Sequence, residues 1–379
     1  MKHQAFGHVE FKLSELDIRM VKSVPQGGNW KNIPEEIPSK RLEQIRISGG
    51  RTTLYGRLSW AAPSYTVTTY FNRPGNGCYV HPDLDRVITA LEAARLQSFP
   101  DSYRFKGSKT SLTKQIGNAV PPLLAFEIGK KIRARYPNIT NVVDLFAGAG
   151  GLSTGLEWAG LNPVVANDFF PAAAETYRHN HERVHFIEGD ITLPEIREGL
   201  SASIERIGDV GMIAGGPPCQ GFSHAGLRMI DDPRNTLYKH FVDLVARHHP
   251  KIVLMENVEG ILSINGGKTY TEIKQHFADL GYAVEGRKLH AAAYGVPQRR
   301  KRVVIIGVLD GDPSELFPDP ILDMTEYVNV REAMWDLKVD TVESLELGVV
   351  PEPATSAFQE FAQGVISPAE YSKSLKTRH

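Results

Sequence analysis

The chain has 379 residues, of which 41% are hydrophobic and 23% are charged, and its net charge at pH 7 is −1. These values are ordinary for a globular protein with one large domain and a smaller one. The near-neutral balance argues against nucleic-acid binding over the whole surface, so any such contact needs a local basic cleft.

Segments for membranes or export are not expected. No apolar run approaches the ~18 residues of a membrane span, and the first residues lack the apolar core of a signal peptide. Two cysteines, Cys78 and Cys219, provide no disulfide framework. We therefore expect a reducing, cytoplasmic location.

The first 50 residues predict little regular structure. Residues 1–50 are polar, and 26–38 has the paired glycines, Asn and prolines of turns. Residues 51–71 are rich in Thr, Tyr and Val, which predicts two short strands interrupted at Ala62-Pro63. Arginines alternate with aromatic residues here, which suits a nucleic-acid-binding face, and a solvated β-ribbon is the alternative. The residues concerned are Arg51, Tyr55, Arg57, Trp60, Tyr65 and Arg73.

Two helices are predicted next in the chain. Residues 88–105 open as a helix that stops at Pro100, and residues 123–136 form a second helix with cations in its last turns. Residues 105–122 between them carry three lysines and a Gly-Asn turn. Only residues 137–140 separate the second helix from the strand that follows.

From residue 142, strands and helices alternate, which predicts a Rossmann-like, doubly wound α/β sheet. The last two apolar segments are joined by a link too short for a helical crossover, so the last strand should run antiparallel. After residue 309 the pattern is lost, except for one amphipathic helix at 328–337. The expected strands are 142–146, 162–167, 185–188, 210–214, 251–255, 282–290 and 303–308, and the expected helices end at Trp158 or span 171–180, 236–249 and 270–281.

One cysteine stands out in the sequence GGPPCQGFS at 215–223. Cys219 follows a buried strand, at the edge where open α/β sheets hold reacting groups. Pro217 and Pro218 fix the backbone and so set the direction in which the thiol approaches. A lone cysteine is more often a small, inert core residue. The flanking residues and three further segments favour a nucleophile.

The cysteine loop resembles the nucleophile loop of the DNA cytosine-5 methyltransferases. VVDLFAGAGGLSTGL (142–156) resembles their cofactor loop, ENVEGIL (256–262) their acidic segment, and VPQRRKRVVIIGV (296–308) their Gln-x-Arg-x-Arg strand. GRLSWAAPSYTVTT (56–69) and KQIGNAVPPLLAFEIGKKI (114–132) resemble the last two family blocks. The match covers most of residues 25–335. The last two blocks come first here, so the resemblance implies a circularly permuted enzyme of the bacterial restriction-modification type.

The resemblance implies S-adenosylmethionine as cofactor, S-adenosylhomocysteine as product, and no metal. An acidic residue after the second strand can bind ribose hydroxyls, and an aromatic neighbour can cover adenine. The family usually has Glu where Asp168 stands. The implied cofactor residues are Asp144, Phe146, Gly148, Gly150, Asp168, Phe169, Asp190, Pro217, Leu237 and Asn118.

The reaction needs a nucleophile because carbon 5 of cytosine is unreactive. A thiolate that adds at carbon 6 gives carbon 5 enamine character. By resemblance Cys219 is this thiolate, Glu256 is the acid at ring nitrogen 3, and Asn257 fixes the turn behind it. Gln298, Arg300 and Arg302 alternate along one strand, so they should share a face toward the target nucleotide, and a basic edge strand is the alternative.

A base in a duplex must be flipped out before it can react. The expected lid is the segment 220–235, which follows the nucleophile directly. The expected DNA contacts are Ser223, Arg228, Arg57, Thr66 and Thr68.

The sequence therefore predicts a monomeric DNA (cytosine-5-)-methyltransferase of bacterial or phage origin. It would act on double-stranded DNA beside a cognate restriction endonuclease, without a stable complex. Residues 1–84 and 311–379 would form a small target-recognition domain, 85–116 a hinge and 117–310 the catalytic domain. The alternatives are an RNA cytosine-5 methyltransferase and a non-catalytic DNA-binding regulator. A nicotinamide oxidoreductase is disfavoured, because 142–151 contains no GxGxxG.

Overall fold

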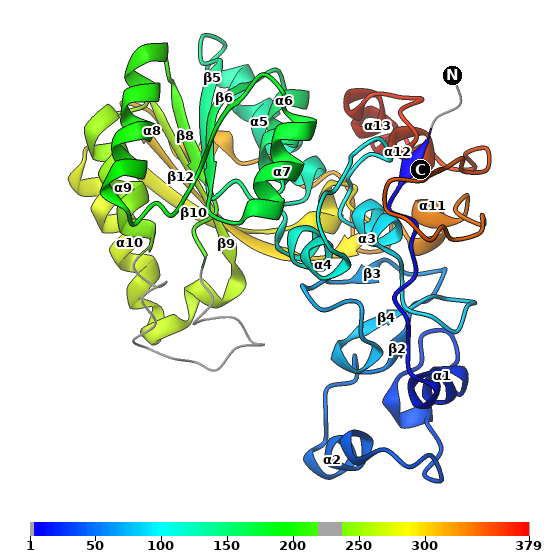
Figure 1. The fold of residues 1–379 in the computed structure, drawn as a ribbon. Coiled ribbons are helices and arrows are strands. Elements are labelled where there is room, and N and C mark those ends of the chain that lie inside the picture. The colour runs from blue at the N-terminus through cyan, green and yellow to red at the C-terminus, as the bar shows by residue number, and fades with distance from the viewer. Residues whose placement is uncertain (1–3, 219–236, 379) are drawn as a thin grey trace. The chain divides into compact units, whose positions relative to one another are not determined.

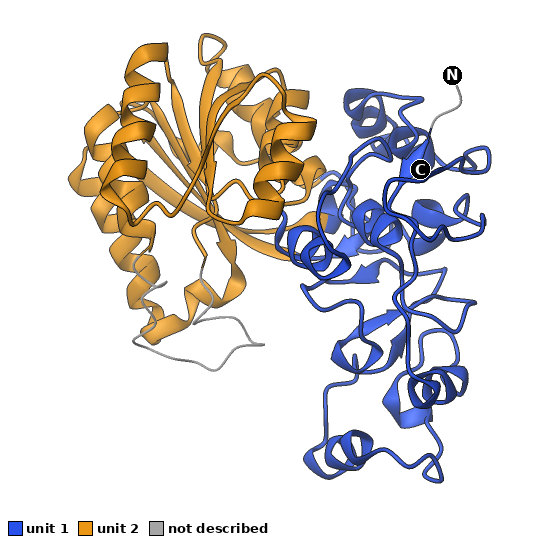
Figure 2. Cartoon of the chain, viewed as in Figure 1, with its two compact units in different colours: residues 1–119, 292–300, 321–379 blue, residues 120–291, 301–320 orange. Residues whose placement is uncertain are grey.

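The structure is a computed structural model that describes residues 4–218 and 237–378. The chain divides into two units, which Figure 2 colours separately. Unit 1 comprises residues 1–119, 292–300 and 321–379, and unit 2 comprises residues 120–291 and 301–320. Within the described ranges, no helix is long and apolar enough to cross a membrane.

Unit 2 is built on a seven-stranded sheet with the order β10-β12-β9-β8-β5-β6-β7 (Figure 1). Every neighbouring pair from β9 to β7 is parallel, whereas β12 is antiparallel to both β9 and β10. This confirms the predicted doubly wound α/β class and the antiparallel last strand. The strands are β5 (Asn141–Leu145), β6 (Asn162–Asp168), β7 (His185–Glu188), β8 (Met212–Gly215), β9 (Ile252–Val258), β10 (Tyr282–His290) and β12 (Lys301–Leu309).

Helices flank this sheet. Side chains of α8, α9 and α10 pack with β5, β8, β9 and β12 in one large apolar cluster, so these helices cover one face. Helix α8 was not among the expected helices; Pro194 opens it and Gly208 ends it at a φ of 78°. The helices are α5 (Pro122–Arg135), α6 (Gly151–Trp158), α7 (Pro171–Asn180), α8 (Pro194–Ile207), α9 (Leu237–His248) and α10 (Lys268–Asp279).

Unit 1 contains short elements from both ends of the chain. Strand β1 (Ala5–Phe6) pairs with β13 (Gly348–Val349), so residues far apart in sequence share a ladder. Strand β2 (Gly56–Arg57) pairs with β4 (Cys78–Val80), and β3 (Ser64–Tyr65) pairs with β11 (Gln298–Arg299). The helices are α1 (Glu15–Lys22), α2 (Lys40–Ser48), α3 (Ala90–Leu96), α4 (Lys109–Asn118), α11 (Val330–Met334), α12 (Ala357–Ala362) and α13 (Pro368–Leu375).

Several local expectations for unit 1 were wrong. Residues 15–22 and 40–48 are helical, and the two helices help to enclose a small apolar core around Met20, Leu42 and Ile45. Helices α12 and α13 lie in the C-terminal region where no pattern was visible. Residues 109–118 form α4, so Gly117 lies inside a helix rather than in a turn.

The segment 85–116, which we expected to be a hinge, belongs to unit 1. Every residue of α3 is buried. The Arg95 guanidinium lies 2.6 Å from Asp101 and 2.5 Å from Asp336, all three side chains being buried. A buried cation with two carboxylates is costly to pull apart, so this cluster ties the N-terminal part of the unit to its C-terminal part.

Candidate active site

The carboxyl ends of three neighbouring strands form the candidate site of unit 2. Leu145 at the end of β5 lies beside Gly215 at the end of β8, and Gly215 lies beside Met255 on β9. The loop after β5, the loop after β8 and the last residues of β9 are therefore neighbours. This is the edge where open parallel sheets bind ligands.

The loop after β5 has an unusual backbone. Phe146, Gly148 and Gly150 all have left-handed φ values, of 57°, 55° and 91°. Such a φ is strained for Phe146 and easy for the glycines. A Cβ built on Gly148 would meet nothing within 4 Å, so open space lies beside this backbone.

Asp168 at the end of β6 holds this loop in place. One carboxylate oxygen accepts the N–H of Gly148 at 2.8 Å, and the other accepts the N–H of Phe170 at 2.8 Å. Burial raises the pKa of Asp168, and these backbone N–H groups oppose the rise. The neighbouring Phe169 is 65% exposed, which leaves its ring free to stack on a ligand.

Asp144 is a buried carboxyl group under the same loop. Its Oδ2 accepts a 2.6 Å hydrogen bond from Ser153, whereas its Oδ1 has no partner among the described residues. The Ser153 hydroxyl also lies 2.6 Å from the Tyr177 hydroxyl. Burial raises the pKa of Asp144 to about 7, against the opposing Ser153 hydrogen bond. Ser153 and Tyr177 were not predicted, because nothing in the sequence links them to Asp144.

The remaining expected cofactor residues of unit 2 lie at nearby strand and helix ends. Asp190 is exposed and accepts the N–H of Thr192 at 2.9 Å. Leu237 is half-buried at the start of α9. Pro217 is buried in the loop after β8. Together with an orphaned buried oxygen on Asp144 and an exposed ring on Phe169, these groups fit a nucleoside carrying a cation.

Glu256 on β9 pairs with Arg302 on β12. Arg302 Nε lies 2.7 Å from Glu256 Oε1, and each residue is only 8% exposed. Burial lowers the pKa of Arg302, and the Glu256 carboxylate opposes this. A Cβ on Gly216 would lie 3.2 Å from the other carboxylate oxygen of Glu256, so the loop after β8 approaches the acid closely.

Asn257 joins this loop to β9. Its side-chain amide donates a 3.1 Å hydrogen bond to the Pro217 carbonyl, and its Oδ1 accepts the Val258 N–H at 2.8 Å. The expected role of Asn257 in fixing the turn is therefore visible in the contacts. Cys219, Ser223, Arg228 and the expected lid 220–235 lie outside the described residues.

Gln298 and Arg300 do not share a strand face with Arg302. Strand β11 ends at Arg299 and β12 begins at Lys301, and Gln298 and Arg300 belong to unit 1. Both are fully buried. The Gln298 amide donates to the Leu96 carbonyl and accepts the Val67 N–H, and the Arg300 guanidinium donates to the carbonyls of Val67, Gly117 and Ala119. In the structure they bind backbone, because the strand breaks between them and Arg302.

Arg57 is not available to bind DNA, contrary to our expectation. It is 5% exposed, and its guanidinium makes five hydrogen bonds, to the carbonyls of Val21, Val24, His81 and Leu84 and to the Asp85 carboxylate. A guanidinium has five N–H donors, so none remains for a phosphate.

The other expected contacts of unit 1 are partly exposed. The Thr66 hydroxyl donates to the Arg299 carbonyl at 2.8 Å, and the Thr68 hydroxyl lies 2.7 Å from the Tyr79 hydroxyl. Asn118, an expected cofactor residue, is exposed at the end of α4. Tyr55 and Trp60, which suited a nucleic-acid face, are buried.

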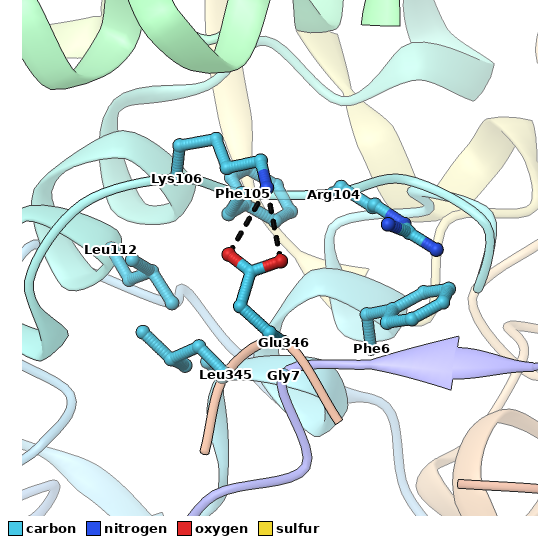
Figure 3. A pocket seen from close by; sticks show the side chains of 9 residues that line it. Phe6, Gly7, Arg104, Phe105, Lys106, Leu112, Leu345 and Glu346 are labelled. Carbon is cyan, nitrogen blue, oxygen red and sulfur yellow. Dashed lines mark hydrogen bonds and ion pairs between the residues drawn. The ribbon is translucent and has the colours of Figure 1, made fainter. Parts of the chain in front are cut away.

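A small hollow in unit 1 is unrelated to these residues (Figure 3). Arg104 lies over the Phe6 ring at 3.8 Å, and the Lys106 ammonium is 3.0 Å from both Glu346 oxygens. The volume of this hollow is about 10 Å³, the space of a single water molecule. It cannot hold a nucleoside. In the described part of the chain, no three His, Cys, Asp or Glu residues are grouped to hold a metal ion.

A family model described as C-5 cytosine-specific DNA methylase matches residues 10–134 and 140–368. The Type II methyltransferase M1.HphI of Haemophilus parahaemolyticus is 42% identical over 195 residues, 51% of each chain. M.BspRI of Lysinibacillus sphaericus is 38% identical over 234 residues, 53% of each chain. The chain thus spans about half the length of these curated relatives. Among solved structures, the S. pombe Dnmt2 methyltransferase is 26% identical, with a TM-score of 0.38, over 46% of this chain and 52% of its own.

Proposed function

The chain belongs to the C-5 cytosine-specific DNA methylase family, and we propose that it is a DNA (cytosine-5-)-methyltransferase. It would methylate carbon 5 of a cytosine within a specific duplex sequence. The observation that carries this proposal is the buried Glu256–Arg302 pair beside the loop that leads to Cys219. Glu256 on one strand and Cys219 in the loop after the neighbouring strand could act on nitrogen 3 and carbon 6, which are opposite atoms of the cytosine ring.

We propose that unit 2 holds S-adenosylmethionine at the loop after β5, and that S-adenosylmethionine, when bound, supplies the methyl group. Asp168 and Phe169 would receive the ribose and the adenine, and the free oxygen of Asp144 would accept a donor from the ligand. Gly148 and Gly150 would let the backbone approach it closely. S-adenosylhomocysteine would leave from the same place, and no metal would take part.

Glu256 would hold the flipped cytosine by its Watson–Crick edge and share a proton with ring nitrogen 3. Arg302 fixes the position of that carboxylate through the 2.7 Å contact. Asn257 would set the approach of Cys219 by tying down the Pro217 carbonyl at 3.1 Å. The Cys219 thiolate would add to carbon 6, and the same bond would break when carbon 5 loses its proton. Base flipping is required because a stacked base exposes neither face.

The relatives are named Type II methyltransferases, and we propose a similar setting here. The chain would protect host DNA from a restriction endonuclease without forming a stable complex with it. We also propose that the chain acts as a monomer in the cytoplasm and that its segments are circularly permuted relative to the family order. A transfer assay decides between the main alternatives. Tritium should pass from labelled S-adenosylmethionine to duplex DNA and not to transfer RNA. Transfer to RNA alone, or to neither, would refute the proposal.

The nucleophile has a separate test. Duplex DNA with 5-fluorocytosine at the target position should form a stable adduct, because fluorine cannot leave as a proton does. The adduct should appear as a shifted band in denaturing electrophoresis and be absent in Cys219→Ser. Cys78→Ser is the matched control, because Cys78 is 5% exposed and burial raises its pKa to about 12. An adduct that survives Cys219→Ser would exclude Cys219 as the nucleophile.

A further inference from the structure

Arg299 is an exposed arginine between two buried residues. Gln298 and Arg300 on either side are fully buried and bind backbone groups of unit 1. The carbonyl of Arg299 itself accepts the Thr66 hydroxyl at 2.8 Å. The backbone is thus fixed on both sides of Arg299. A side chain on a fixed backbone loses less entropy when it binds a ligand.

Aromatic side chains lie next to Arg299. The ladder between β11 and β3 places it beside Tyr65, which is 45% exposed. Burial raises the pKa of Tyr327, Asp323 adds to this rise, and the positive charge of Arg299 opposes it. Arginine among exposed aromatic rings is typical of surfaces that bind nucleic acids.

The guanidinium of Arg299 makes no hydrogen bond or ion pair with another described residue. This distinguishes it from Arg57 and Arg95 of the same unit, which are buried and bound to carboxylates. An exposed guanidinium with its donors unused can bind a phosphate through two parallel N–H groups.

Arg299 also lies close to Arg302 along the chain. Three residues span at most about 11 Å in any conformation, so the Cα atom of Arg299 stays within that distance of the Cα atom of Arg302. Arg302 is the residue that pairs with Glu256. We propose that Arg299 binds a phosphate of duplex DNA next to the target cytosine. This inference rests on the proposed function and adds a contact that replaces the one expected from Arg57.

The test measures DNA affinity of the full chain as a function of salt. The probes are a fluorescein-labelled duplex with the site mapped by plasmid methylation and a duplex with that site shuffled. Each phosphate contact contributes about 0.9 to the slope of log affinity against log salt. Arg299→Ala should reduce the magnitude of this slope by about one and should weaken binding to both duplexes by the same factor. Arg299→Lys should keep the slope, because it keeps the charge.

Two control variants test whether a change in the salt slope comes from the charge of Arg299. Arg206→Ala removes an exposed arginine at the end of α8, a helix that leads to the opposite edge of the sheet from the site. Tyr65→Ala disturbs the ladder partner without changing the charge. Both should keep the wild-type slope. An unchanged slope in Arg299→Ala, an equal fall in either control, or a loss confined to the site-bearing duplex would overturn the inference. If wild type methylates no duplex, it is the proposed function that fails.

Discussion

At the scale of single residues, the candidate site depends on buried charges that need partners. Glu256 and Arg302 are nearly enclosed, and the Arg302 Nε lies 2.7 Å from the Glu256 Oε1. Breaking a buried pair by removing one charge typically costs about 3–5 kcal/mol. A change at Glu256 therefore affects both stability and chemistry, and an experiment must separate the two.

Glu256→Gln should lower turnover by about 10²–10⁴-fold, the usual contribution of general acid catalysis, because an amide cannot deliver a proton. S-adenosylmethionine affinity, measured by calorimetry, should stay within a few-fold of wild type and show that unit 2 is folded. Glu259→Gln is the matched control, since Glu259 lies on the same segment and its partly exposed carboxylate pairs with Lys288. Turnover near the wild-type value in Glu256→Gln would make Glu256 structural.

Asp144 should make stability depend on pH. Burial raises its pKa from 3.8 to about 7, so the folded chain keeps a proton that the unfolded chain releases. The contribution of Asp144 to the free energy of unfolding should therefore be largest below pH 4 and should fall as the pH rises to about 7. The full effect is at most about 4 kcal/mol.

Urea unfolding at several pH values without cofactor checks this. The side chain introduced by Asp144→Asn is neutral at every pH, so this variant should lose less free energy of unfolding between pH 4 and 7 than wild type. Asp168 has the same sign of pKa shift, so part of the fall should remain. Asp209→Asn, at an exposed aspartate, should follow the wild-type curve. A curve for Asp144→Asn parallel to that of wild type would contradict the prediction.

At the scale of elements, the sequence predicted unit 2 well and unit 1 poorly. Buried parallel strands are continuous apolar runs, so β5 and β8 begin and end within two residues of the expected bounds. The elements of unit 1 are short, and pairing partners such as β1 and β13 lie more than 300 residues apart in the chain. Local patterns cannot show such partners. The same limit hid the burial of Arg57, whose hydrogen-bond acceptors come from helix α1 and from the loop after β4.

Two glycines of unit 2 should respond to alanine in opposite directions. A Cβ on Gly215 would lie 2.3 Å from the Leu145 carbonyl oxygen on the neighbouring strand β5. Gly215→Ala should therefore destabilise the protein by about 1–3 kcal/mol. A Cβ on Gly199, inside α8, would meet nothing within 4 Å, so Gly199→Ala should stabilise it by about 0.5–1 kcal/mol. Urea unfolding measures both, and a shift of the same sign in both would contradict the argument.

At the scale of the whole molecule, unit 1 is assembled from distant parts of the chain. Strand β13 completes the ladder of β1, Asp336 neutralises Arg95, and the Tyr371 hydroxyl of α13 donates to the Gly295 carbonyl at 2.8 Å. The C-terminal residues thus support both the N-terminal part and the segment before Gln298. Deleting residues 340–379 should impair DNA recognition and spare S-adenosylmethionine binding, because the expected cofactor residues other than Asn118 belong to unit 2. Site-specific methylation by the truncated chain would contradict this.

The predicted circular permutation can be tested by reversing it. In the family order that the resemblance implies, the recognition region follows the Gln-x-Arg-x-Arg block, and here the two chain ends take its place. Helix α5 ends at Arg135 and β5 begins at Asn141, and Pro137 and Asn138 between them are exposed. A chain opened between Pro137 and Asn138, with His379 joined to Met1 by a short flexible linker, breaks no helix or strand. It should methylate the same plasmid sites as wild type, as read by bisulfite sequencing. A chain opened inside β5 with the same linker is the control and should not fold. Loss of activity or altered sites in the first chain would show that the present order of the segments is required.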